Sequence, residues 1–221
     1  MPVRACIFDF DGTLVDSMWV WEALGADFCA RAGIEMEVGF CSRLAQLGLE
    51  SASRVFVAEY GLDESPEDLF AHWLAVVSEK YSSEVFLKPG AKEFLRGLAA
   101  QGIKLGVATA NRPGPLRLAL ENNGVAGLFD VALSADEVTD KGKSTPEVYW
   151  AAAERLGAPV SECLVFEDVL GPAQQAHSGG FRVVGVYDDS TAQDHDALRA
   201  EADAFIESYV FAEKELAPFL S

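Results

Sequence analysis

The stretch "ACIFDFDGTLVDS", Ala5–Ser17, decides the fold because it joins an apolar run directly to a crowd of acidic residues. The run Val3–Phe8 is short, apolar and bounded by charge, which is typical of a parallel strand covered on both faces. Asp9 and Asp11 follow at once, and Gly12 lets the backbone turn tightly. Carboxylates this close repel unless a cation shares them or one is protonated, whereas the simpler interpretation is a pair of turn-capping aspartates.

Further apolar runs alternate with segments of helical periodicity along the rest of the chain. These runs are Lys104–Thr109, Asp130–Ser134, Glu162–Phe166 and Arg182–Tyr187. One intervening segment, "STPEVYWAAAERLG", has Thr145 as a candidate N-cap, Pro146 at the first helical position and Gly157 at its end. The alternation predicts an α/β fold with a doubly wound, Rossmann-like parallel sheet. Residues 200–220 predict a final edge strand followed by an amphipathic helix.

One long segment breaks this alternation. Residues 16–86 contain no convincing strand, only helical patterns rich in Ala, Leu, Phe and Trp. A crossover between parallel strands needs far fewer residues, so we predict an all-helical cap domain at 16–86. The α/β core domain then consists of residues 1–15 and 87–221. The insertion leaves the core at the carboxyl end of the first strand, where open α/β sheets bind ligands, so it is expected to act as a lid.

The composition excludes some classes of partner. The chain has 17 Lys and Arg against 35 Asp and Glu, a net charge of −18, which disfavours nucleic acid. An anionic substrate needs a locally inverted field, for instance from a metal ion. No apolar run reaches the roughly 18 residues of a membrane span, and the N-terminus lacks the pattern of a secretory signal. The four cysteines form no CxxC pair, so we expect a cytoplasmic protein with reduced thiols, by default a monomer.

Three later features also fall at predicted strand ends. Thr109 offers a hydroxyl group and the backbone N–H groups after it to an anionic oxygen; Lys143 precedes a helix; and Glu167 and Asp168 form a second acidic pair. Singly, each has a plain interpretation as a helix cap or a solvated charge. Together they favour metal-assisted phosphoryl transfer, because a doubly wound sheet brings its strand ends to one crevice.

The order DFDGT, strand–Thr109, Lys143 and Glu167-Asp168 resembles the four signature motifs of the haloacid dehalogenase-like superfamily. It is most similar to the phosphatase and β-phosphoglucomutase-like branch, which carries a helical cap between the first two motifs. The resemblance implies a Mg²⁺-dependent phosphomonoester hydrolase. Its substrate would be a small phosphorylated metabolite, such as a sugar phosphate, and its intermediate an aspartyl-phosphate.

The resemblance also implies residue roles. Asp9 attacks phosphorus, and Asp11 protonates the leaving oxygen and then deprotonates the attacking water. Thr109 and Lys143 hold the transferring phosphoryl group. The implied metal ligands are the carboxylates of Asp9 and Asp168 and the backbone carbonyl of Asp11. Glu167 is implied either as a further ligand or as an anchor that holds a ligand in place.

Substrate contacts are expected from residues beside the second motif and in the cap. Asn111 and Arg112 follow Thr109 directly, and Arg43 lies in the cap segment. The chain departs from the family at two positions: Ser144 stands where Pro is frequent, and Pro172 where Gly is usual. Both changes put the roles of neighbouring loop residues in doubt.

Two alternative functions remain open on the sequence. β-Phosphoglucomutase-like members carry a cap histidine shortly after the first motif, where this chain reads "MWVWEAL", Met18–Leu24. A phosphosugar mutase is therefore disfavoured, although it stays the main alternative. The second alternative is a non-catalytic protein that binds a phosphorylated ligand, and the intact pair Asp9 and Asp11 argues against it.

Overall fold

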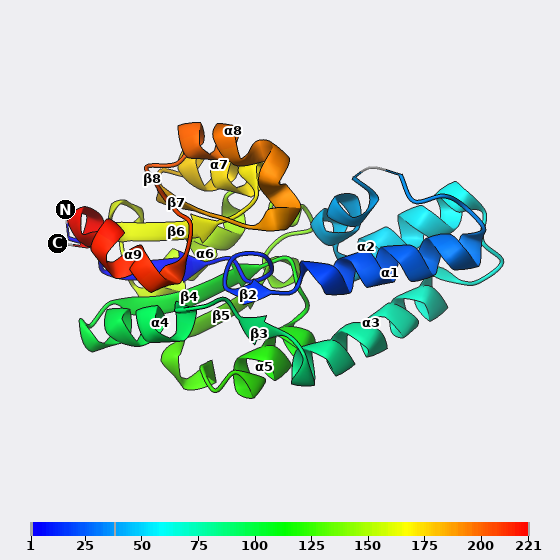
Figure 1. Cartoon of the computed structure of the whole chain (residues 1–221), viewed down its shortest axis with the longest axis horizontal. Coiled ribbons are helices and arrows are strands. Elements are labelled where there is room, and N and C mark those ends of the chain that lie inside the picture. The colour runs from blue at the N-terminus through cyan, green and yellow to red at the C-terminus, as the bar shows by residue number, and fades with distance from the viewer. Residues whose placement is uncertain (1, 38, 221) are drawn as a thin grey trace.

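A computed structural model describes residues 2–37 and 39–220, and its centre is a six-stranded, wholly parallel sheet (Figure 1). The strands stand in the order β5-β4-β1-β6-β7-β8. Their bounds are β1 Ala5–Phe8, β4 Lys104–Thr109, β5 Val131–Ser134, β6 Cys163–Glu167, β7 Arg182–Val186 and β8 Ala204–Ile206. Each predicted apolar run is a strand, and the C-terminal edge strand is present. The predicted doubly wound α/β fold is confirmed.

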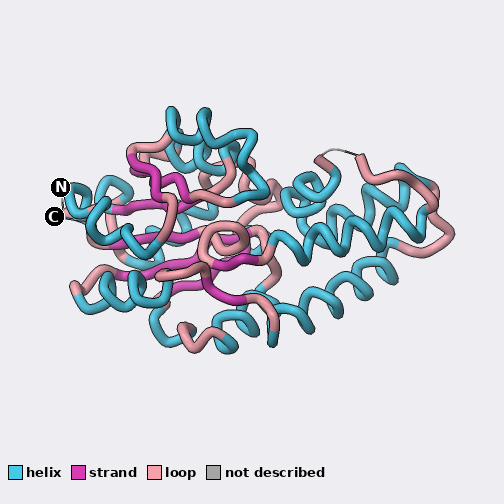
Figure 2. Tube along the Cα trace, in the orientation of Figure 1, coloured by secondary structure: helices cyan, strands magenta, loops and turns pink. Residues whose placement is uncertain are grey.

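Helices cover both faces of the sheet, as the tube along the chain shows (Figure 2). They are α4 Ala91–Ala100, α5 Pro113–Asn122, α6 Glu147–Leu156, α7 Leu170–Ser178, α8 His195–Glu201, α9 Tyr209–Glu215 and α10 Ala217–Leu220. Successive residues of β1 point to opposite faces, so Phe8 packs in one buried cluster and Ile7 in another. The Phe8 ring stacks on that of Phe166, with centroids 4.3 Å apart. This double burial explains why the strands read as continuous apolar runs.

Three long helices project from the sheet beyond the end of β1 (Figure 1). We call α1 Met18–Ala32, α2 Phe40–Tyr60 and α3 Pro66–Ser83 the helical insert, and α2 is kinked at Gly48. It lies between β2 Val15–Asp16 and β3 Phe86–Leu87, which pair antiparallel. This two-residue ribbon was not predicted. The insert is all-helical as predicted, whereas the division into domains at 15/16 and 86/87 stays a prediction.

The helical insert has an aromatic core of its own. The fully buried Trp73 packs against Phe28 and Phe56, with ring centroids 5.8 and 6.2 Å away. Helix α3 starts at Pro66, where Ser65 Oγ accepts a hydrogen bond from the Asp68 backbone N–H. Such a cap satisfies one of the free donors at a helix start. The insert therefore carries the packing and the capping that hold its helices in place.

One helix start differs from its prediction. Pro146 occupies the N-cap position of α6, and the helix begins at Glu147. Thr145 is not the N-cap, because its hydroxyl donates to the Glu147 carboxylate at 3.2 Å rather than capping the backbone. Gly157 ends the helix in a left-handed conformation, as predicted.

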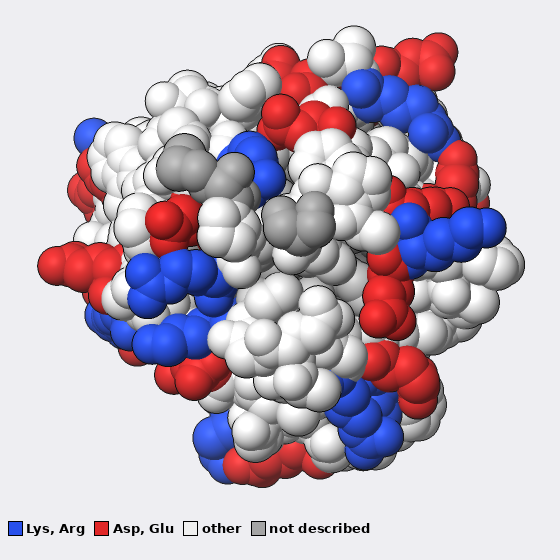
Figure 3. Space-filling view, turned by 90° about the vertical axis from the view of Figure 1, so that its left-hand side faces the viewer, with Lys and Arg blue, Asp and Glu red and all other residues white. Residues whose placement is uncertain are grey.

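The surface carries charges of both signs. At the end of the molecule opposite the helical insert, Lys and Arg side chains lie beside Asp and Glu (Figure 3). Within residues 2–37 and 39–220, no helix combines the length and apolar character that a membrane crossing requires.

Candidate active site

The register of the central strands brings the predicted site residues to one edge of the sheet. Phe8 stands opposite Val107 of β4 on one side and Phe166 of β6 on the other. Asp9 and Glu167 therefore lie at the same level, and the Asp9 backbone N–H donates to the Phe166 carbonyl at 2.9 Å. Parallel pairing thus places residues from distant parts of the chain side by side.

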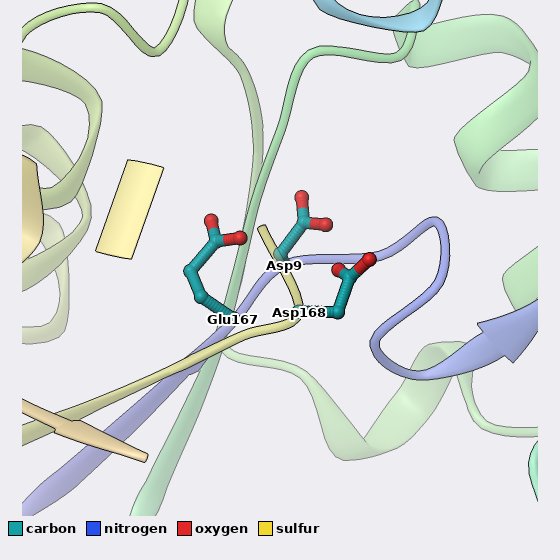
Figure 4. Close-up of side chains that lie close together, drawn as sticks. All are labelled: Asp9, Glu167 and Asp168. Atoms are coloured by element: carbon teal, nitrogen blue, oxygen red, sulfur yellow. The ribbon is translucent and has the colours of Figure 1, made fainter. Parts of the chain in front are cut away.

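Three carboxylates meet at this edge. Asp9, Glu167 and Asp168 each offer an oxygen within 4.8 Å of the other two, and their side chains converge in the close-up view (Figure 4). All three residues are buried. Oδ2 of Asp168 and Oε2 of Glu167 have no hydrogen-bond partner in the described part of the chain. Buried oxygens without a partner are costly, so this cluster fits a cation.

The loop after β1 fixes one member of the cluster. Thr13 Oγ1 donates to Oδ1 of Asp168 at 2.6 Å. Gly12 has a φ of 77°, and a Cβ atom on it would lie 2.4 Å from Oδ2 of Asp168. Only glycine combines this backbone conformation with so close an approach. The "DGT" of the first motif thus shapes the position of Asp168.

Lys143 provides positive charge beside the carboxylates. Its Nζ donates to Oδ1 of Asp9 at 2.6 Å and also to Oε1 of Glu167. The buried Tyr149 hydroxyl donates to the same Glu167 oxygen at 2.5 Å. The side chain of Lys143 is 8% exposed, so these pairs are largely shielded from water. The loop before α6 therefore carries its cation into the carboxylate cluster.

Burial and crowding shift the proton affinities of the cluster. Burial raises the pKa of Glu167 to about 7, while the nearby charge of Lys143 opposes the shift. Burial and the charges of Asp9 and Glu167 raise the pKa of Asp168 well above its ordinary value. Burial alone would lower the pKa of Lys143, but the two carboxylates it contacts raise it instead. Lys143 thus keeps its charge, and the carboxylates repel one another.

Asp11 points to a different set of partners from Asp9. Ser17 Oγ donates to its Oδ1 at 2.7 Å, and the Tyr81 hydroxyl donates to the same oxygen. Asn111 Nδ2 donates to Oδ2 at 3.1 Å. Burial raises the pKa of Asp11, and these hydrogen bonds counteract the shift. The side chain of Asp11 stays outside the three-carboxylate cluster, which fits a metal contact through its backbone carbonyl only.

The end of β4 and the loop after it carry Thr109 and Asn111, and Asn111 contacts Asp11. Both are buried, and Thr109 Oγ1 accepts a hydrogen bond from the Asn111 backbone N–H at 3.0 Å. A hydroxyl that accepts in this way still has its own hydrogen to donate. Thr109 is therefore able to donate a hydrogen bond, and its contact with a phosphoryl oxygen stays a prediction.

The two arginines predicted to contact substrate are already paired. Arg112 contacts the carboxylates of Glu50 at 2.9 Å and Asp136 at 3.1 Å, and so ties the helical insert to the core. Arg43, on α2, pairs with Glu59 and contacts none of the other predicted site residues among those described. The structure does not bring Arg43 into the cluster, and substrate contact by either arginine stays a prediction.

Several contacting residues were missed by the sequence reasoning: Thr13, Ser17, Tyr81 and Tyr149. Thr13 and Ser17 lie in the quoted stretch Ala5–Ser17, so their closeness to Asp11 in the sequence could have identified them as site residues. Tyr149 follows Lys143 on a predicted helix, and a buried tyrosine hydroxyl usually finds a partner. Tyr81 carried no such signal.

Of the two family departures, Ser144 lies in a turn and Pro172 in a helix. Ser144 closes a turn in which its backbone N–H and its hydroxyl both donate to the Lys141 carbonyl. Pro172 lies in the first turn of α7, a position that tolerates a residue without an N–H group. Neither side chain takes part in the hydrogen bonds of Lys143 or Asp168 described above.

The chain is similar to proteins named phosphatases and to solved structures with the same fold. The chain is 29% identical over 197 residues to the "Probable pseudouridine-5'-phosphatase" of Drosophila melanogaster, covering 87% of this chain and 85% of that protein. It is 29% identical to the "Validoxylamine A 7'-phosphate phosphatase" of Streptomyces hygroscopicus subsp. limoneus over 92% of both chains. The fold matches the crystal structure of CbbY from Rhodobacter sphaeroides in complex with phosphate, with a TM-score of 0.82, 20% identity, and coverage of 95% and 96%.

The family model described as haloacid dehalogenase-like hydrolase matches residues 3–171. This range contains the four motifs from Asp9 to Asp168, so the resemblance seen in the sequence is confirmed. The chain belongs to the haloacid dehalogenase-like hydrolase family.

Proposed function

We propose that this protein is a Mg²⁺-dependent phosphomonoester hydrolase that acts on small phosphorylated metabolites through an aspartyl-phosphate on Asp9. The observation that carries the proposal is the buried cluster of Asp9, Glu167 and Asp168 in contact with Lys143. The phosphatase names of the relatives support the same reaction class. The proposed substrate class extends to sugar phosphates, since one relative is named a hexitol phosphatase.

The donor set suits magnesium. Asp9 and Asp168 supply hard carboxylate oxygens, with Glu167 adjacent, and two buried oxygens of this group lack partners among the described residues. These residues, with the backbone carbonyl of Asp11, would hold the ion. When bound, the ion supplies positive charge that offsets the carboxylates and polarises phosphoryl oxygens.

Asp9 is the proposed nucleophile. Its carboxylate lies at the end of the central strand β1 and accepts a hydrogen bond from Lys143 Nζ at 2.6 Å, which orients it. A carboxylate oxygen of Asp9 forms a bond to phosphorus while the bond from phosphorus to the ester oxygen breaks. Lys143 and Thr109 donate hydrogen bonds to the phosphoryl oxygens during this transfer, because both lie at the same sheet edge.

Asp11 is the proposed general acid and base. It gives a proton to the ester oxygen as the alcohol leaves. It then takes a proton from water, whose oxygen attacks phosphorus while the bond to Asp9 breaks, and inorganic phosphate departs. The hydrogen bonds from Ser17, Tyr81 and Asn111 hold the carboxyl group for both transfers.

A phosphate-release assay tests the proposal. The protein is incubated with 4-nitrophenyl phosphate and a panel of phosphorylated metabolites, with Mg²⁺ or with a chelator. We expect release with Mg²⁺ only, and none from the Asp9→Asn variant. The control is Asp16→Asn, since Asp16 is an exposed acid of the same motif. Activity that persists in Asp9→Asn would refute the covalent route.

A further inference from the structure

A buried tyrosine of the helical insert contacts the proposed general acid. The Tyr81 hydroxyl donates to Oδ1 of Asp11, 70 residues away in sequence. Tyr81 lies in the last turn of α3 and is fully buried. The ring of Phe10, the neighbour of Asp11, packs 6.4 Å from the Tyr81 ring. The contact is therefore held by packing as well as by the hydrogen bond.

The donors around Asp11 distinguish its two oxygens. Oδ1 accepts from two hydroxyl groups, those of Tyr81 and Ser17, whereas among the described residues Oδ2 accepts only from Asn111 Nδ2. The Asn111 amide is fixed in this orientation because its own oxygen accepts the Arg112 backbone N–H at 2.8 Å. Two donors occupy both lone pairs of Oδ1, so a proton carried by Asp11 resides on Oδ2.

The hydrogen bond from Asn111 places Oδ2 next to the segment that carries Thr109. Asn111, its partner, is two residues beyond Thr109 and bonds to the Thr109 hydroxyl through its backbone N–H. With Oδ1 held by the two hydroxyl donors, the other oxygen of Asp11 lies toward the segment of Thr109, the residue proposed to bind the phosphoryl group.

We propose that Tyr81 is a positioning residue, which holds Oδ1 of Asp11 so that Oδ2 delivers the proton to the leaving oxygen. This inference rests on the proposed function. Tyr81 acts through Asp11 and does not itself touch substrate. As the phosphorus–ester oxygen bond breaks, the proton passes from Oδ2 to that oxygen, and Asp11 becomes a carboxylate. The Tyr81 and Ser17 hydroxyls then stabilise the new negative charge.

The variant Tyr81→Phe tests this role with two matched esters, phenyl phosphate and 4-nitrophenyl phosphate. Phenolate is a poor leaving group and needs the proton, whereas 4-nitrophenolate leaves readily without one. We expect kcat/KM to fall about tenfold for phenyl phosphate and to change less than about twofold for 4-nitrophenyl phosphate. The parameter kcat/KM reports only the steps up to phosphoryl transfer onto Asp9, so hydrolysis of the aspartyl-phosphate does not affect it.

Two further variants sharpen the test. Ser17→Ala removes the other hydroxyl from the same oxygen and should show the same preference between the esters. Tyr60→Phe, at the end of α2 and outside the site, should change neither rate. An equal fall on both esters in Tyr81→Phe, or no fall on either, would overturn the positioning role.

The same measurements separate this inference from the proposed function. If Tyr81→Phe fails to fold, Ser17→Ala carries the test, and an equal fall on both esters in that variant would overturn the inference. Release of phosphate by Asp9→Asn would instead refute the covalent reaction, whatever Tyr81→Phe does. A wild-type protein that hydrolyses neither ester would overturn both proposals.

Discussion

Gly12 and Asp168 approach each other so closely that a Cβ atom on Gly12 would lie 2.4 Å from the Asp168 carboxylate. The two residues are far apart in sequence, and the pairing of β1 with β6 brings them together. The first motif thus contributes a shape to the site as well as its acids. Its glycine leaves space for Oδ2 of Asp168, which has no hydrogen-bond partner among the residues that the structure describes.

Gly12→Ala should abolish both phosphate release and the response of the protein to Mg²⁺, because the new methyl group displaces Asp168. The matched control is Gly33→Ala. Gly33 has a φ of 67° and no atom within 4 Å of its added Cβ. In both variants, backbone strain should lower the free energy of unfolding by about 1 kcal/mol, which chemical denaturation measures. Loss of activity in both to the same degree would contradict the steric explanation.

Lys143→Met should lower kcat about a hundredfold or more, because the donor and positive charge beside the phosphoryl group are lost. Lys141→Met is the control, since Lys141 is exposed and two residues away. Steady-state kinetics with 4-nitrophenyl phosphate measure both. If the two variants lose activity equally, the loop as a whole matters and the contact of Lys143 with Asp9 does not.

The metal-free protein should lose stability as pH rises from about 4.5 to about 7. The pKa of Glu167 is raised from 4.5 to about 7 in the folded state, so the folded protein holds a proton that the unfolded chain has released. The free energy of unfolding therefore falls across this window. Denaturation with a chelator present measures it at several pH values.

Glu167→Gln should flatten this pH dependence, because the substituted side chain does not titrate. Glu79→Gln, which removes an exposed acid on α3, should leave the slope as in the wild type. Parallel curves for the wild type and Glu167→Gln would show that Glu167 does not carry the effect.

Mg²⁺ should raise the unfolding temperature, and more at pH 8 than at pH 5. Protons compete with the ion for the carboxylates, whose pKa values are raised in Glu167 and Asp168. Asp168→Asn should abolish the shift, whereas Asp63→Asn, an exposed acid of the insert, should keep it. An equal shift in Asp168→Asn would place the ion elsewhere.

The sheet and its acidic edge were predictable because their signals are local. A strand buried on both faces needs a continuous apolar run, and parallel strands must end at one edge. Asp9, Lys143 and Asp168 could therefore be assigned to one site from the sequence alone. The ribbon β2–β3 escaped prediction, since two residues per strand leave no periodicity to detect.

Contacts between the insert and the core could not be predicted. The hydrogen bond from Tyr81 to Asp11 depends on how α3 packs against the loop after β1, which no local pattern encodes. The same holds for Arg112, whose partner Glu50 belongs to α2. The start of α6 was predicted one residue early. Thr145 and Pro146 both suit a helix start, and the sequence alone does not show which of them is the N-cap.

The most direct test is to trap the phosphoryl group on the protein. The enzyme is mixed with a radiolabelled phosphomonoester substrate and Mg²⁺, quenched in acid within one turnover, and digested for peptide mapping. Label should appear on the peptide that contains Asp9, and be absent from that peptide in Asp9→Asn. Label on another residue, or full turnover with no labelled peptide at any time, would contradict the assignment of Asp9 as the nucleophile.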